Sequence, residues 1–142
     1  MLHTLRYATL GFAFAVTPAL AQNAELTPSA AGASVRIISP ADGATVSSPV
    51  TVLFGLSGMG IAPAGVDWDN TGHHHLLLNR DLPELNTVIP ANDQSIHFGG
   101  GQTETSLELA PGTHTLQLLL GDFRHVPHDP PLYSEVVTIT VE

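Results

Sequence analysis

The chain has 142 residues, a formal net charge of −9, no cysteine and a hydrophobic content of 43%. Lysine is absent, and beyond residue 21 the only bases are Arg36, Arg80 and Arg124. Nucleic acids and anionic membrane surfaces are recognised through basic patches, so neither is an expected partner. The lack of cysteine also excludes disulfides, thiolate metal sites and a cysteine nucleophile.

Residues 1–21 have the pattern of a secretory signal peptide. Arg6 supplies the positive start, residues 8–16 (ATLGFAFAV) form a short apolar core, and residues 19–21 (ALA) match the A-x-A cleavage pattern. The apolar run is shorter than the roughly 20 residues that a membrane-spanning helix needs, and no later run is long enough. We therefore expect a periplasmic or secreted protein that is not inserted in the membrane after cleavage.

Residues 22–34 (QNAELTPSAAGAS) are small, polar and interrupted by proline, which predicts a flexible leader. Residues 35–142 then form one domain of ordinary size. Short runs of alternating polarity separated by glycine and proline indicate strands, and no helical period is present. The predicted strands are residues 35–39, 50–57, 73–79, 95–98, 103–109, 113–120 and 134–141. About seven strands predict an all-β fold, an immunoglobulin-like antiparallel β-sandwich.

The corner before the sixth predicted strand supports this fold class. Residues 109–116 (LAPGTHTL) resemble the Pro-Gly corner of immunoglobulin-like domains, where a tyrosine often stands in the place of His114. His114 shares a face with apolar residues of the strand, so we assign it a structural role.

Three consecutive histidines, His73, His74 and His75, lead into the apolar run Leu76-Leu77-Leu78. Side chains alternate along a strand, so His73 and His75 project to one face while His74 projects to the other. Two imidazoles presented in this way can converge on one zinc or copper ion. The alternative is that these histidines are hydrogen-bonded polar residues at the start of a strand.

A second group of candidate ligands follows in the proline-rich segment 125–131 (HVPHDPP), where the prolines restrict the backbone. His125 and His128 are candidate ligands there, and Asp122 or Asp129 could orient an imidazole. The alternative is a rigid turn with exposed histidines.

Two further residues are outer candidates for the same site. His97 precedes three consecutive glycines, and Met59 offers a soft thioether that favours Cu(I). Residues 67–70 (DWDN) are rich in oxygen ligands but lack the glycine and final glutamate of a calcium loop.

Motifs for catalysis are missing from the sequence. There is no G-x-S-x-G elbow, and residues 99–101 (GGG) are not followed by the Lys and Ser/Thr of a phosphate-binding loop. We therefore predict that the protein is not an enzyme.

The motifs in combination resemble a known family. Residues 38–65 (ISPADGATVSSPVTVLFGLSGMGIAPAG), GHHHLLL, HFGGGQTE and LAPGTHTLQLLLGDFRHVPHDPP are similar to DUF4399, a bacterial family of exported domains of unknown function. The resemblance extends from Val35 to Val141 and implies an exported domain without specifying an activity.

The sequence thus predicts an exported metal-binding domain that handles or delivers copper, with zinc as the alternative ion. The predicted ligands are His73, His75, His125 and His128, with His97 and Met59 as outer candidates. Affinity is expected to fall as the pH drops through roughly 6.5, the pKa of a free imidazole. The alternative is a structural or interaction module of the cell envelope that binds a protein partner and no metal.

Overall fold

The structure is a computed structural model that describes residues 25–142. The predicted signal peptide and the first three residues of the predicted leader lie outside the described residues. Nine strands follow one another in the described chain: β1 (Ser34–Ser39), β2 (Thr45–Val46), β3 (Val50–Ser57), β4 (Gly60–Ile61), β5 (Thr71–Leu78), β6 (Ser95–His97), β7 (Glu104–Leu107), β8 (Gly112–Gly121) and β9 (Val137–Val141). Residues 25–142 contain no helix that is long and apolar enough to cross a membrane.

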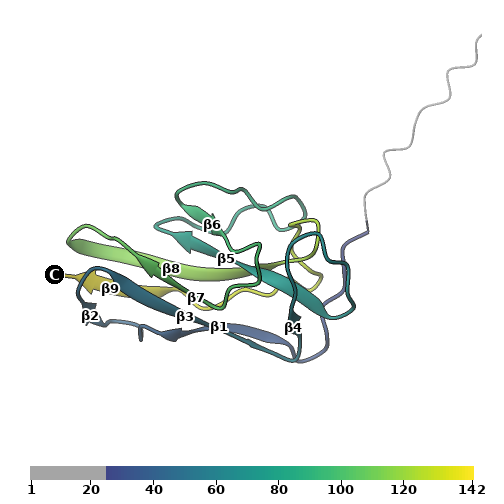
Figure 1. Ribbon diagram of the computed structural model, residues 1–142, viewed down its shortest axis with the longest axis horizontal. Coiled ribbons are helices and arrows are strands. Elements are labelled where there is room, and N and C mark those ends of the chain that lie inside the picture. Colours follow the sequence, from purple (N-terminus) through teal and green to yellow (C-terminus); the bar gives the residue numbers. More distant parts are fainter. Residues whose placement is uncertain (1–24) are drawn as a thin grey trace, which may run out of the picture.

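The strands form two sheets that pack as the layers of a sandwich (Figure 1). One sheet has the order β1-β3-β7, and the other has the order β2-β9-β8-β5-β4 with β6 also paired to β5. Most pairs are antiparallel, but β2–β9 and β4–β5 are parallel. The all-β sandwich predicted from the sequence is confirmed.

The main hydrophobic core lies between the two sheets. Alternate residues of β3, β8 and β9 point into it, as the period of two in their sequences predicts. The buried residues on these three strands are Val50, Val52, Phe54, Leu116, Leu118, Leu120, Val137, Ile139 and Val141. Burying such side chains drives the sheets together, at about 1.5–3 kcal/mol for each one removed from water.

A second, smaller apolar cluster covers the outer face of the larger sheet. Leu77 of β5 and Leu119 of β8 are buried there beneath Ile89, which lies in the long connection between β5 and β6. Leu82 and Leu85 of the same connection pack against them. This connection therefore shields part of the outer sheet face from solvent. The same outer face continues to the first residues of β5.

The described part of the predicted leader is held to the rest of the domain by backbone hydrogen bonds. Asp129 N–H donates to the carbonyl of Thr27, and Ser29 N–H donates to the carbonyl of Asp129, at 2.9 and 3.0 Å. Residues 25–29 thus lie along the proline-rich segment that carries the predicted second half of the site.

Candidate metal centre

Strand β5 divides the histidine triplet between its two faces. His74 points into the sandwich, where its ring packs against Phe54 with 5.2 Å between centroids. His73 and His75 point to the outer face and are fully buried, as is His74. The predicted alternation is therefore observed, and it places two imidazoles beside the apolar cluster under Ile89.

Two further histidines meet this pair from other parts of the chain. His97 stands opposite His75 in the antiparallel pairing of β6 with β5. His125 comes from the loop that follows β8, the neighbour of β5 on its other side. Four residues spread over 53 positions of sequence thus gather on one side of β5. We call His73, His75, His97 and His125 the histidine cluster.

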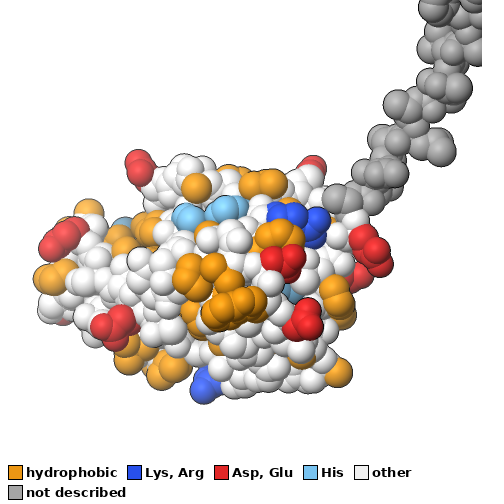
Figure 2. All heavy atoms as spheres, turned by 45° about the vertical axis from the view of Figure 1, so that its right-hand side comes forward, with side chains coloured by type: hydrophobic (Ala, Val, Ile, Leu, Met, Phe, Trp, Pro, Cys, Tyr) orange, Lys and Arg blue, Asp and Glu red, His pale blue; other side chains and the backbone are white. Residues whose placement is uncertain are grey.

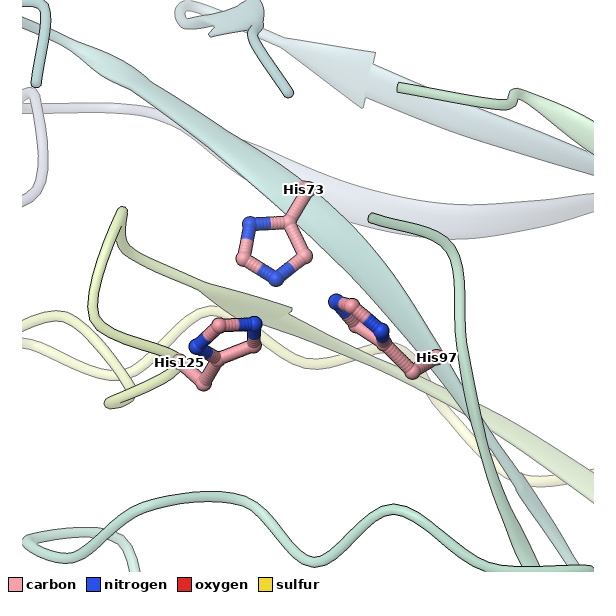
Figure 3. A group of neighbouring side chains, drawn as sticks. All are labelled: His73, His97 and His125. Atoms are coloured by element: carbon pink, nitrogen blue, oxygen red, sulfur yellow. The ribbon is translucent and has the colours of Figure 1, made fainter. Parts of the chain in front are cut away.

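The rings of the histidine cluster are close enough to share one ion. The centroid of His73 lies 4.9 Å from that of His75 and 5.0 Å from those of His97 and His125. His97 and His125 are 4.7 Å apart, and the widest pair, His75 and His125, is 6.2 Å apart. Figure 3 shows the rings of His73, His97 and His125 turned toward a common centre.

One ring nitrogen from each of His73, His97 and His125 lies within 4.8 Å of the other two. Metal–imidazole bonds are about 2.0–2.1 Å long, so an ion at the centre of that triangle needs each nitrogen to approach by at most roughly 0.7 Å. The three residues could therefore hold a metal ion, and the ring of His75 lies beside them.

The buried nitrogens of the cluster lack hydrogen-bond partners within residues 25–142. These are both ring nitrogens of His73, both of His75, and Nε2 of His97. An unpaired buried polar group costs about 1–3 kcal/mol, so a ligand that pairs with these nitrogens is favoured. The donor set therefore fits a bound ion, which would occupy one nitrogen of each ring.

Burial also keeps these imidazoles neutral. Burial, and after it neighbouring His125 and His97, lower the pKa of His73 to about 4, while Asp122 opposes the shift. Burial, assisted by His73, His97 and His125, lowers the pKa of His75 to about 3. The pKa of His97 is also lowered by burial and by His125. Neutral imidazole is the form that binds metal, so His73 and His75 stay competent well below the pH of roughly 6.5 expected from the sequence.

Two glycines leave room for the rings. A Cβ on Gly99 would lie 2.3 Å from Cε1 of His97, so the His97 ring rests directly on this backbone. A Cβ on Gly121 would lie 2.9 Å from Cε1 of His75. Any larger residue at either position would displace a ring of the cluster.

The loop that carries His125 is wound around the carboxylate of Asp122. One oxygen of Asp122 accepts hydrogen bonds from the backbone N–H groups of Arg124 and Val126, at 2.8 and 3.0 Å. His125 itself has φ of 66°, a left-handed conformation that non-glycine residues seldom adopt. Its carbonyl accepts from the N–H of Ile89 at 2.8 Å, which ties the loop to the cover of the outer face.

The cluster has a buried floor and an accessible rim. His73 and His75 form the floor, whereas His97 and His125 are half-buried. Figure 2 shows a patch of histidine side chains at the surface, next to basic side chains. An ion could therefore arrive from solvent at the rim residues and be held by the floor residues.

The structure does not bring all of the predicted ligands together. His128 lies against Gly72, on the face of β5 opposite to His73, and its Nε2 donates to the carbonyl of Thr71 at 3.1 Å. Met59 packs its thioether side chain against the main core. A β-bridge pairs Pro127 with Gly121, the last residue of β8. This pairing separates His125, which lies in the loop before Pro127, from His128, which follows it.

His114 has the structural role predicted for it. Its Nε2 lies 2.8 Å from the carbonyl of Ala110, and its Nδ1 lies 3.0 Å from the side-chain amide of Asn79. An Nε2–H donor with Nδ1 as acceptor satisfies both contacts. This histidine, unlike those of the cluster, has a partner at each nitrogen.

Sequence reasoning missed the residues that shape the site without binding at it. Gly99 and Gly121 were visible only as turn or strand glycines, and Thr27 lay in a segment expected to be flexible. Asp122 was expected to be able to orient an imidazole, whereas its carboxylate accepts hydrogen bonds from the backbone N–H groups of Arg124 and Val126 in its own loop. No local signal shows which ring a glycine faces.

Comparison with known proteins gives a family and nothing more specific. Residues 52–142 match the family DUF4399, described as a domain of unknown function. No curated protein and no solved structure matches the chain.

Proposed function

The chain belongs to the DUF4399 family, and we propose that its histidine cluster binds a single transition metal ion. The observation that carries this proposal is the set of five buried imidazole nitrogens without partners, gathered from β5 and β6, with the ring of His125 from the loop after β8 beside them. A hydrogen-bonded structural role would give each ring a partner, as His114 has. Both nitrogens of His74 on the opposite face are unpaired too, so it is the unpaired nitrogens together with the convergence of four rings on one side of β5 that favour the metal-binding hypothesis over the purely structural one.

We propose copper as the ion and zinc as the alternative. Imidazole donors suit both metals, and at a given nitrogen site divalent copper binds more tightly than divalent zinc. Met59, the one methionine among residues 25–142, packs against the core, so no thioether in the described chain supports Cu(I) at the cluster and the proposal is for Cu(II). An ion held by neutral imidazoles keeps its full charge, and the acidic chain around it offsets that charge.

Handling of the ion, as opposed to catalysis, fits the site best. Half-buried His97 and His125 let an ion enter and leave, whereas structural metal sites are closed. The predicted signal peptide places this exchange in the periplasm or outside the cell. We propose that the protein binds copper there and passes it to another acceptor of the envelope.

The test uses untagged protein, because an added histidine tag would bind the same ions. Metal content after purification and a competition titration against a chromophoric chelator measure stoichiometry and affinity. We expect one copper ion per chain and weaker binding of zinc. Absence of any stoichiometric copper or zinc would overturn the proposal.

Substitutions of the half-buried residues His97 and His125 test the site without creating a cavity in the hydrophobic core. We expect His97→Gln and His125→Asn each to lower copper affinity by at least about tenfold, since each removes one ligand. Asn is chosen at position 125 because it tolerates the left-handed backbone there. The matched control His114→Gln should leave affinity unchanged. Equal affinity in all three variants would show that the ion lies elsewhere.

A further inference from the structure

The N-terminal segment 25–29 lies across the loop that carries His125, and we call this segment the strap. Its Thr27 and Ser29 form backbone hydrogen bonds with Asp129, and Pro28 forms a parallel bridge to the same residue. The strap is therefore paired with the chain just beyond His125, about a hundred positions away in sequence.

The strap also completes the hydrogen bonds of Asp122, the residue around which the His125 loop is wound. The Thr27 hydroxyl donates to Oδ2 of Asp122 at 2.7 Å. Arg124 donates to the same oxygen through Nε and Nη2, at 3.1 and 3.0 Å, and its Nη2 also reaches the carbonyl of Glu25 at 3.1 Å. The carboxylate is 1% exposed, so these donors replace water around a buried charge.

Loss of the strap would leave this arrangement incomplete. Without Thr27, Oδ2 of Asp122 would lose its shortest hydrogen bond, and Arg124 would lose its contacts with Glu25 and Thr27. The loop that would then relax holds His125 in a left-handed conformation, which persists only where the surroundings enforce it. The position of the His125 ring therefore depends on contacts that the N-terminal segment supplies.

We infer that docking of the strap and binding of metal at the histidine cluster are coupled, with Asp122 as the positioning residue between them. This inference rests on the proposed function. Coupling of this kind is reciprocal: a docked strap raises metal affinity, and bound metal holds the strap in place by the same factor. A protein that binds or displaces the N-terminal segment would then release the ion, because His125 would lose its support.

The test combines two variants with a measurement on the unaltered protein. Thr27→Val removes the hydroxyl donor with little change of shape, and Asp122→Asn removes the charge that organises the loop. Thr51→Val is the matched control, because Thr51 is exposed on β3 in the opposite sheet. Copper affinity is measured by chelator competition, the visible absorption of bound Cu(II) reports its ligands, and circular dichroism checks the fold.

We expect Thr27→Val and Asp122→Asn to lower copper affinity by roughly fivefold or more and to shift the Cu(II) absorption band, with Thr51→Val unchanged. Hydrogen exchange of the wild-type protein should show that copper slows exchange at the amides of Ser29 and Asp129. This second measurement needs no variant, so it stands even if a substitution impairs folding.

The possible failures are distinguishable. If the wild-type protein binds copper and the folded variants Thr27→Val and Asp122→Asn bind it with the same affinity, the coupling is overturned. The proposed function is then unaffected. Equal exchange at Ser29 and Asp129 with and without copper does the same. Wild-type protein that binds no metal overturns the proposed function and this inference together.

Discussion

Acid should destabilise the metal-free protein at a pH where most domains of this size are still stable. The pKa of His73 and that of His74 are about 4, and the pKa of His75 is about 3, mainly because burial disfavours the charged form. In the unfolded chain all three return to about 6.5. The unfolded state therefore binds more protons between pH 6.5 and 4, so stability is full above this window and is lost as the pH falls through it.

The magnitude follows from the same values. At pH 5 an imidazole that is protonated only in the unfolded state destabilises the fold by up to about 2 kcal/mol. Three such groups, allowing for partial relaxation around each ring, give a loss of about 3–6 kcal/mol between pH 7 and pH 5. A loss of this size is a large part of the 5–15 kcal/mol that typically separates folded from unfolded states.

Urea unfolding of metal-free protein, followed by far-ultraviolet circular dichroism, measures this loss. The midpoint should move to lower urea at pH 5, with the slope of the free energy against urea unchanged. Trp68 is a poor probe because its side chain is 66% exposed. An unfolding free energy that stays constant between pH 7 and pH 5 would refute the assignment of buried, neutral histidines.

Two substitutions test the division of roles within this part of the fold. His74→Leu should raise the unfolding free energy by about 1–3 kcal/mol, because it replaces a buried ring whose two nitrogens have no partner with an apolar side chain of similar volume. The same substitution should reduce the loss of unfolding free energy between pH 7 and pH 5 by about a third and leave copper affinity unchanged. A fall in copper affinity would contradict the separation of His74 from the site. Gly99→Ala should lower copper affinity by roughly 10- to 100-fold in chelator competition, because its Cβ would displace the His97 ring. Unchanged affinity in Gly99→Ala would exclude His97 as a ligand.

The strands could be predicted from the sequence because their signal is local. Each of the seven predicted strands overlaps an observed one, and alternate residues of β3, β8 and β9 line the main core. The two strands that were not predicted, β2 and β4, have two residues each and form parallel pairs with distant partners. Segments so short carry no period of their own, so only tertiary contacts define them.

The candidate site was predictable only in part, for the same physical reason. The shared face of His73 and His75 follows from alternation along one strand. The meeting of His75 with His97 depends on the register of β6 against β5, which no local pattern specifies. The separation of His128 from His125 depends on a reversal of the chain at Pro127. Proximity in sequence therefore predicted the wrong neighbour for His125.

The triplet on β5 joins the two properties on which the proposed function depends. Burial keeps His73 and His75 neutral and ready to bind an ion, but it also leaves their nitrogens without partners, so the metal-free state is destabilised. An ion that binds the folded state alone would add stability of about 2.7 kcal/mol at a free concentration of 100 times Kd. Under the proposed function, loading with copper therefore compensates part of the cost of burying the floor histidines. The half-buried rim then decides how readily the ion leaves, because His97 and His125 are the members of the cluster that reach solvent.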